Sequence, residues 1–366
     1  MSWIRVLFFN VLVTLALIGG ILLAPPILYG VYKFYKQSDV AAPDVRSTFK
    51  LYDNYPWAKD HFSEFSHLST TYYDYITWRR DDFSGKTINI HGGLRKTSIP
   101  AEIDKKRDQF WFFGGSTTWG TGVSDAYTYP SLFAEKMSLK AINFGETGYI
   151  SRQSLSLLEN QLIREDRVSS LKGIHVVFYD GVNDVESHCR AEAEGFGTVR
   201  QAQIRKLLAD RWSYERTFGQ IVTFVQNFLR STHSLPEAVA QKAFTCAMDS
   251  VRAREVATNL VNTWEAAAAL VTARGGKFTA ILQPVSFIGS PQLDYLKQGD
   301  SFSKVLGEQY VVVYPLVREI ASKRGFRFFD MTGVYDGCDF CYVDHYHVGP
   351  DAHKLLVTPM SDLLMD

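Results

Sequence analysis

A serine in a glycine-rich turn is the first residue of this sequence whose position suggests chemistry. Ser116 follows a short apolar run, Phe110 to Phe113, and two glycines, Gly114 and Gly115. The run predicts a buried strand, and the glycines place the serine in a tight turn at the strand's carboxyl end. Open α/β sheets bind their ligands at that edge. Ser116 is therefore a candidate nucleophile, with the cap of the following helix as its alternative role.

A histidine and an aspartate near the C terminus could activate this serine. A serine hydroxyl is a weak nucleophile that needs an adjacent base. His347 can accept its proton, while Asp344 holds the imidazole tautomer and stabilises the imidazolium. Three residues of separation let both side chains come from one turn of the chain. His345 is the alternative base, and the spacing favours His347.

Acyl transfer also needs donors for the oxygen that becomes negatively charged in the tetrahedral intermediate. The backbone N–H of Ser116, the N–H of Gly148 and the side-chain amide of Asn183 are chemically suitable. Glycine at position 148 would let the backbone approach a substrate closely. Asn183 could instead be a turn residue, with Asp184 as the cap of the next helix.

The elements that must position these groups alternate along the chain. The candidate strands span residues 109–113, 141–144, 174–179, 277–283 and 327–330, and the candidate helices span 129–137, 151–164, 252–274, 303–323 and 350–365. This alternation predicts a parallel five-stranded sheet in a three-layer α/β/α sandwich. The candidate residues follow its strands, so one sheet edge should bring them together. The rhythm breaks at about 190–250, which we interpret as a helical insertion.

Taken together, these short motifs resemble those of the SGNH, or GDSL-type, hydrolase superfamily. Ser116 corresponds to the first-block serine, although Gly114-Gly115-Ser116-Thr117 departs from Gly-Asp-Ser-Leu. Gly148, five residues after Asn143, corresponds to the second-block glycine, and Asn183 corresponds to the third-block asparagine in Gly-x-Asn-Asp. Asp344 and His347 correspond to the final Asp-x-x-His motif. The choice of Gly148 over Gly145 follows the family spacing. The resemblance covers roughly residues 108–366.

The resemblance implies a flavodoxin-like sheet, no metal or organic cofactor, and esterase, lipase, deacetylase or O-acyltransferase activity. Membrane-anchored proteins of this general form often act on acylated cell-surface polysaccharides, so an acylated small molecule or glycan is the expected substrate. Two alternatives are a non-catalytic carbohydrate-binding or assembly protein on the same fold, and a lipase-like esterase. Lys+Arg and Asp+Glu are both 39, and this balance gives no reason to expect a nucleic-acid partner.

The N-terminal segment is long and apolar enough to suggest a membrane anchor. From Val6 to Tyr32, 27 residues carry no charge, whereas a bilayer core needs about 20 apolar residues. A cleaved signal peptide is the alternative, but Leu23-Ala24-Pro25-Pro26 is a poor cleavage site. We therefore expect a single-pass anchor over residues 1–32, with the large C-terminal domain outside the cytoplasm.

Residues 33–105 form a connector before the domain at 106–366. Nine aromatic residues fall between Tyr52 and Trp78, a density that argues against a flexible linker. We expect them to pack on the main domain, with an aromatic surface for sugar rings as the alternative. Arg95 is interpreted as a solvated surface arginine, with contact to an anionic substrate as its alternative role.

The chain has four cysteines, Cys189, Cys246, Cys338 and Cys341. Cys338-x-x-Cys341 lies close to His345 and His347, a pattern that could bind zinc. A disulfide that involves Cys338 and Cys341, with Cys189 as a possible partner, is the favoured interpretation.

Overall fold

The computed structural model describes residues 3–15, 17, 20, 44–104, 107–163, 170–193, 195–198, 201, 204, 244–296 and 301–365. The chain divides into two units, Met1–Ala42 with Leu207–Ala238, and Pro43–Lys206 with Val239–Asp366. In the first unit, residues 3–15 are helical, and most of the expected anchor at 1–32 lies outside the described residues. Of the helices in the described residues, none combines the length and apolarity needed to cross a bilayer. The central sheet and the helices that cover it belong to the second unit.

An eight-stranded mixed sheet forms the centre of this unit, in the order β10-β9-β8-β6-β7-β5-β4-β3. Its parallel strands are β6 (Gln109–Gly114), β7 (Ala141–Asn143), β8 (Ile174–Asp180), β9 (Lys277–Leu282) and β10 (Arg327–Asp330). Numbered along the chain, these five follow the order 2-1-3-4-5, which is the flavodoxin-like arrangement. The order reverses between β6 and β8, and the crevice at such a switch point is where doubly wound sheets bind ligands.

The prediction of a five-stranded parallel sheet is wrong in its strand count. Three further strands, β3 (Phe83–Ser84), β4 (Asn89–His91) and β5 (Leu94–Arg95), extend the sheet in antiparallel pairing beyond β7. They come from the segment interpreted as a connector. Runs of two or three residues are too short to show the alternation that marks a strand. The turn between β4 and β5 uses Gly92 and Gly93, both with positive φ.

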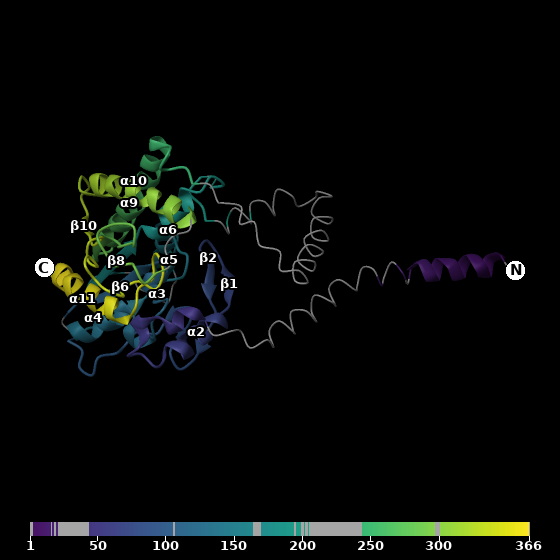
Figure 1. The fold of residues 1–366 in the computed structure, drawn as a ribbon, viewed down its shortest axis with the longest axis horizontal. Coiled ribbons are helices and arrows are strands. Elements are labelled where there is room, and N and C mark those ends of the chain that lie inside the picture. Colours follow the sequence, from purple (N-terminus) through teal and green to yellow (C-terminus); the bar gives the residue numbers. More distant parts are fainter. Residues whose placement is uncertain are drawn as a thin grey trace. The chain divides into compact units, whose positions relative to one another are not determined.

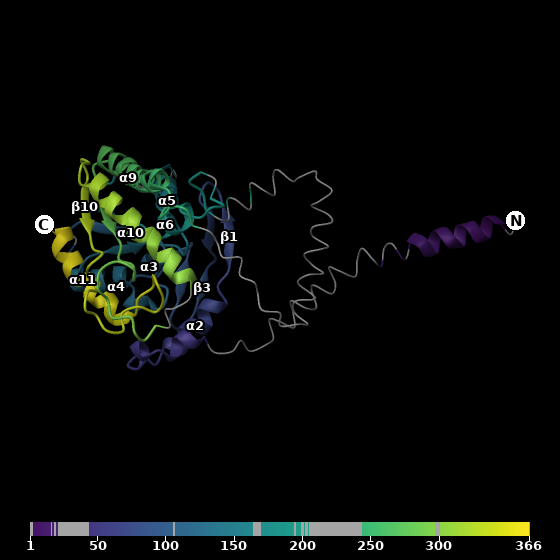
Figure 2. The same cartoon turned by 45° about the horizontal axis from the view of Figure 1, so that its top comes forward.

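Helices cover both faces of the sheet and make the three layers (Figures 1 and 2). One core lies under α5 (Ser151–Ile163), α9 (Ser250–Ala273) and α10 (Ser301–Ala321), and the other lies under α4 (Tyr129–Met137) and α11 (Pro350–Met365). Neighbouring residues of β8 alternate between them: Val176 and Phe178 join the first core, and Val177 and Tyr179 join the second. A strand that is buried on both faces is apolar along most of its length, and for this reason β8 could be predicted from the sequence.

The segment before β3 packs closely on this sheet. It contains α2 (Ala58–Ser66) and a separate hairpin of β1 (Thr70–Tyr73) and β2 (Thr77–Arg80). Tyr52, Tyr55, Phe62 and Trp78 are buried, whereas Tyr72 and Tyr75 are exposed. Four of the nine aromatic residues in this segment are therefore core residues, and Trp57, Phe65 and Tyr73 are partly buried against the core clusters.

A disulfide between Cys189 and Cys246 joins the two ends of the predicted insertion. An isolated bridge between Arg190 and Phe244 lies beside it. The disulfide and the bridge thus hold the two ends of the insertion together. Most of the insertion at about 190–250 lies outside the described residues, and its predicted helical character stays a prediction.

Candidate active site

Three side chains from opposite ends of the domain form a continuous hydrogen-bonded chain. Ser116 is the first residue of the short helix α3 (Ser116–Trp119), directly after β6. Its Oγ lies 2.7 Å from Nε2 of His347, and Nδ1 of the same ring lies 2.7 Å from Oδ2 of Asp344. These distances are those of nucleophile, base and orienting carboxylate. The structure thus brings together the three residues that the sequence predicts.

The carboxylate of Asp344 is held in its ionised form. Its Oδ1 accepts the backbone N–H groups of Tyr346 and His347, both at 2.9 Å. Burial alone would raise the pKa of Asp344, but the His347 ring and the two backbone donors outweigh it and hold the pKa well below its usual value. An ionised Asp344 fixes the proton of neutral His347 on Nδ1, which leaves Nε2 free to accept the Ser116 proton.

The loop that carries His347 is tied at its base. Tyr342 and Val348 form an isolated bridge, and the N–H of Val343 donates to the carbonyl of His347 at 2.8 Å. The hydroxyl of Tyr295 donates to the carbonyl of Tyr342 at 2.8 Å. These bonds fix the path of the backbone on which the imidazole depends.

His345, the alternative base, is engaged elsewhere. Its Nε2 lies 2.8 Å from Oγ of Ser303, and its ring stacks on Phe287.

Cys338 and Cys341 form a disulfide with each other. Within the described ranges, no three His, Cys, Asp or Glu side chains gather as metal ligands.

The loops that carry two of the predicted oxyanion donors meet at the serine turn, because Nδ2 of Asn183 and the carbonyl of Tyr149, next to Gly148, both contact the Cβ position of Gly115. Gly148 has φ +77°, a conformation that favours glycine. Among the residues that the structure describes, none accepts a hydrogen bond from the backbone N–H of Gly148 or of Ser116. Asn183 follows β8 in α6 (Val182–His188) and donates one amide hydrogen to the carbonyl of Tyr149 at 2.7 Å. Its second amide hydrogen can still bond to a ligand.

The structure explains why position 115 is a glycine, which the sequence alone does not reveal. A Cβ atom at this position would overlap Nδ2 of Asn183. The aspartate that Gly-Asp-Ser-Leu sequences carry here could not be accommodated without moving that amide. The departure at Gly115 thus allows the close approach of Asn183 to the serine turn.

Two buried carboxylates fix the loops that carry Asn183 and Gly148. Asp184 accepts the N–H of Ser151 and its hydroxyl, the latter at 2.6 Å, and so joins the start of α5 to the start of α6. Asp180, at the end of β8, accepts the indole N–H of Trp264 at 3.3 Å. Burial raises the pKa of both carboxyls, and the charge of Asp184 raises that of Asp180 further. Asp184 therefore caps α5 rather than α6.

A buried ion pair that sequence reasoning missed holds the Gly148 loop from the other side. Glu146 is fully buried, and its carboxylate lies 3.3 Å from Nε of Arg80. It also accepts the N–H of Arg80 at 2.9 Å and that of Thr147 at 2.7 Å. The Arg80 guanidinium lies 5.3 Å from the centroid of the Trp119 ring. A local sequence pattern could not pair Arg80 with Glu146, because they are 66 positions apart. The only signal in the sequence was the acidic Glu146 between two glycines of the motif.

Arg95 is buried, and the interpretation of it as a surface residue is wrong. Its Nε lies 2.6 Å from Oδ1 of Asp125, and its guanidinium lies 4.2 Å from the centroid of the Trp119 ring. It donates to the carbonyl of Val123 at 2.9 Å. The short strand β5 carries it inward, so Arg95 binds the segment that follows α3 and supports the serine turn.

The N-terminal segment also binds the backbone just after α3. The hydroxyl of Tyr52 donates to the carbonyl of Gly122 at 2.7 Å, and Nε2 of His61 accepts the N–H of the same residue at 3.1 Å. Burial lowers the pKa of His61 well below its usual value, which keeps the ring neutral and able to accept. The aromatic segment therefore positions the site from outside the core sheet.

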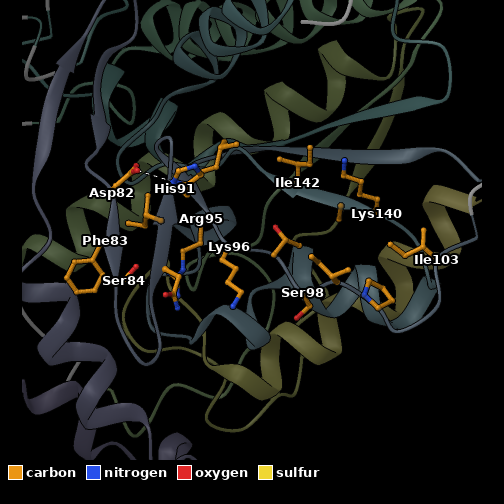
Figure 3. Close-up of a pocket in the computed structure, with 17 residues that line it drawn as sticks. Asp82, Phe83, Ser84, His91, Arg95, Lys96, Ser98, Ile103, Lys140 and Ile142 are labelled. Carbon is orange, nitrogen blue, oxygen red and sulfur yellow. Dashed lines mark hydrogen bonds and ion pairs between the residues drawn. The ribbon is translucent and has the colours of Figure 1, made fainter. Parts of the chain in front are cut away.

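A groove of about 910 Å³ lies apart from these groups, along β3, β4, β5 and β7. Figure 3 shows Phe83 and Ser84 on one side of it and Ser98, Ile103 and Ile142 on the other. Neither Ser116 nor His347 lines it. Arg95 belongs to its lining, but its guanidinium is occupied by Asp125 and backbone carbonyls.

No protein-family model and no curated protein matches the chain. Among solved structures, a member of the lipolytic protein G-D-S-L family from Veillonella parvula DSM 2008 matches at 13% identity with a TM-score of 0.40, over 70% of this chain and 98% of that chain. A carbohydrate acetylesterase family member from Sinorhizobium meliloti matches at 15% with a TM-score of 0.36, over 70% and 97%. A GDSL-like lipase from Bacteroides thetaiotaomicron VPI-5482 matches at 10% with a TM-score of 0.36, over 72% and 91%.

Two of these three structures carry the G-D-S-L name, which is the family that the sequence motifs resemble. With TM-scores of 0.36 to 0.40, these similarities carry no argument about this chain. The case for function therefore rests on the geometry of Ser116 and its partners.

Replacing Arg95 tests its structural role. Arg95→Met leaves Asp125 without its cation and should lower the free energy of unfolding by about 3–5 kcal/mol. Lys86→Met breaks the exposed pair with Asp60 and should cost at most about 1 kcal/mol. Urea unfolding followed by tryptophan fluorescence measures both. Equal, small losses in the two variants would contradict the role of Arg95.

Proposed function

We propose that this chain is a serine-dependent ester hydrolase or O-acyltransferase. The observation that carries the proposal is the hydrogen-bonded chain from Asp344 through His347 to Ser116. It lies at the switch point of a flavodoxin-like sheet, and the backbone N–H groups of Ser116 and Gly148 donate to no other residue that the structure describes. Hydrolysis and acyl transfer share the first half-reaction, in which the serine is acylated, and differ only in the molecule that then accepts the acyl group.

In the proposed reaction, Oγ of Ser116 attacks the ester carbonyl while Nε2 of His347 takes its proton. The carbonyl oxygen becomes an oxyanion, which the N–H groups of Ser116 and Gly148 and the amide of Asn183 stabilise. The tetrahedral intermediate expels the alcohol, which receives the proton from His347, and an acyl-serine remains. Water or a sugar hydroxyl then attacks this ester, again with His347 as base, and the serine is released.

The substrate class that we propose is acylated carbohydrate at the cell surface. The resemblance of the motifs to SGNH hydrolases, together with the uncharged N-terminal run, supports it. A glycan would provide both an ester to cleave and hydroxyl groups to accept an acyl group. Its recognition would need a surface beside the acyl site.

Loss of the serine hydroxyl tests the proposal directly. Ser116→Ala should lower the hydrolysis of p-nitrophenyl acetate at least about a thousandfold, because the nucleophile is gone. It should also abolish labelling by a serine-reactive fluorophosphonate. Ser303→Ala is the matched control, because Ser303 also hydrogen-bonds to a histidine; its activity should stay near wild type. If Ser116→Ala and wild type behave alike in both assays, the proposed function is wrong.

Gly115 offers a second test, of the oxyanion donors. Gly115→Ala should displace the Asn183 amide and lower kcat about 100- to 1000-fold, the typical cost of one oxyanion donor. Gly325→Ala is the control, because nothing lies within 4 Å of a Cβ there. Circular dichroism should show both variants folded. A Gly115→Ala enzyme with unchanged kcat would exclude Asn183 as a donor.

We also propose that the domain lies outside the cytoplasm behind an N-terminal anchor. The disulfides Cys189–Cys246 and Cys338–Cys341 support an oxidising compartment. In cells quenched with acid, a maleimide should modify these cysteines only after reduction, and the protein should sediment with membranes. Four cysteines that react without reduction, or a protein that stays in the soluble fraction, would contradict this location.

A further inference from the structure

The β1–β2 hairpin presents two exposed tyrosines beside the loop that carries Gly148. Tyr72 is 65% exposed and Tyr75 is 88% exposed, although the other rings of this hairpin are buried or partly buried. In both Figure 1 and Figure 2 the hairpin stands on the side of the sheet away from α4 and α11. Both rings thus lie on the surface of a hairpin that contacts the Gly148 loop.

The hairpin is bound directly to the proposed oxyanion loop. The indole N–H of Trp78 donates to the carbonyl of Thr147 at 3.2 Å, and the hydroxyl of Tyr149 donates to the carbonyl of Trp78 at 2.5 Å. Arg80 adds a bond to the Thr147 hydroxyl at 2.8 Å. Gly148 is thus flanked on both sides by residues that hold the hairpin.

The strand register places Tyr72 on the face of the hairpin that meets this loop. Tyr72 lies directly opposite Trp78, and residues opposite each other in an antiparallel pair share a face. On that face, a Cβ at Gly148 would lie 3.5 Å from Cζ2 of Trp78. Tyr72 therefore extends the Trp78 surface outward from Gly148 while it stays open to solvent.

The tip of the hairpin is held in a costly conformation. Tyr75 and Thr77 have φ of 64° and 91°, in the left-handed region, which is strained for a non-glycine residue. Ile76 between them is fully buried, and Gln153 of α5 donates to its carbonyl at 2.7 Å. These contacts offset the strain, so the Tyr75 ring is presented outward from a fixed backbone.

We infer that Tyr72 and Tyr75 form a recognition surface for a sugar ring of the acylated substrate, next to the acyl group that Ser116 attacks. Tyrosine provides a rigid apolar face and a polar hydroxyl at low entropic cost, which suits a pyranose with its apolar face and hydroxyl rim. A surface on a fixed backbone loses little freedom on binding. The inference rests on the proposed function and adds to it the part of the enzyme that selects the substrate.

Steady-state kinetics on two kinds of substrate test the inference in the full-length protein. We would compare p-nitrophenyl acetate with a panel of acetylated xylo-oligosaccharides and chito-oligosaccharides. For the best of these, the Tyr72→Ala/Tyr75→Ala double variant should lower kcat/KM at least about tenfold, mainly through KM, because the lost contacts bind substrate and transition state alike. Hydrolysis of p-nitrophenyl acetate should stay within about twofold of wild type.

Two further variants serve as controls. The Tyr72→Phe/Tyr75→Phe double variant keeps both rings and should retain most of the oligosaccharide activity. Ile99→Ala removes an exposed side chain, 80% accessible, from the groove in Figure 3, and should change neither activity. A selective loss in Ile99→Ala, with the tyrosine variant unaffected, would place sugar recognition in the groove and overturn the inference.

The remaining outcomes separate this inference from the proposed function. Normal ester hydrolysis, with oligosaccharide turnover either absent in wild type or unchanged in the tyrosine variant, overturns the inference alone. If the tyrosine variant loses acyl release from phospholipid vesicles instead, the surface binds lipid and the inference is wrong. If Ser116→Ala equals wild type on every ester, the proposed function fails and the inference fails with it.

Discussion

The hydrogen bond between His347 and Ser116 is the contact on which the rest of the site depends. It joins the turn after β6 to the loop before α11, which are more than 200 residues apart. In this fold the parallel sheet delivers both loops to one edge and so brings the two side chains within 2.7 Å. The strand order places this contact at the switch point, where the paths after β6 and β8 diverge and leave room for a ligand.

The segment before the parallel sheet supports this site through side chains that contact the serine turn and the Gly148 loop. Arg95 and Arg80 approach the Trp119 ring at the end of α3, and each has a carboxylate partner. One of these partners, Glu146, lies in the loop that carries Gly148. The nucleophile turn and the proposed oxyanion loop are therefore held by the same group of arginines. Buried ion pairs of this kind are costly to break, which ties the geometry of the site to the stability of the fold.

From the sequence it was possible to predict the strands, which depend on local pattern, and the site residues, which lie on loops at one edge of the sheet. The strands β6, β8 and β9 are largely apolar runs, and Ser116 and Asn183 follow the ends of β6 and β8 by two and three residues. Asp344 and His347 were found instead from their Asp-x-x-His spacing, in the loop between β10 and α11. The sequence could not predict the burial of Arg95, because that depends on a two-residue strand and a partner 30 positions away. It also left the cysteine pairing open, since the Cys189–Cys246 bond becomes evident only when the two ends of the insertion are seen to meet.

Gly115 shows how a departure from a family motif can be understood only in three dimensions. In the sequence it weakened the match to Gly-Asp-Ser-Leu. In the structure it is the position at which a side chain would displace Asn183. The glycine and the asparagine amide therefore form one arrangement, although they belong to loops almost 70 residues apart.

The central claim is that Ser116 carries the acyl group between the two half-reactions. Rapid acid quench of the full-length protein during turnover of p-nitrophenyl acetate, followed by peptide mass spectrometry, tests it most directly. The account predicts one added acetyl group on the peptide that contains Ser116, located on that serine by fragmentation. An acetyl group on a different residue, or turnover with no acylated peptide under conditions in which release of the acyl group is rate-limiting, would contradict it.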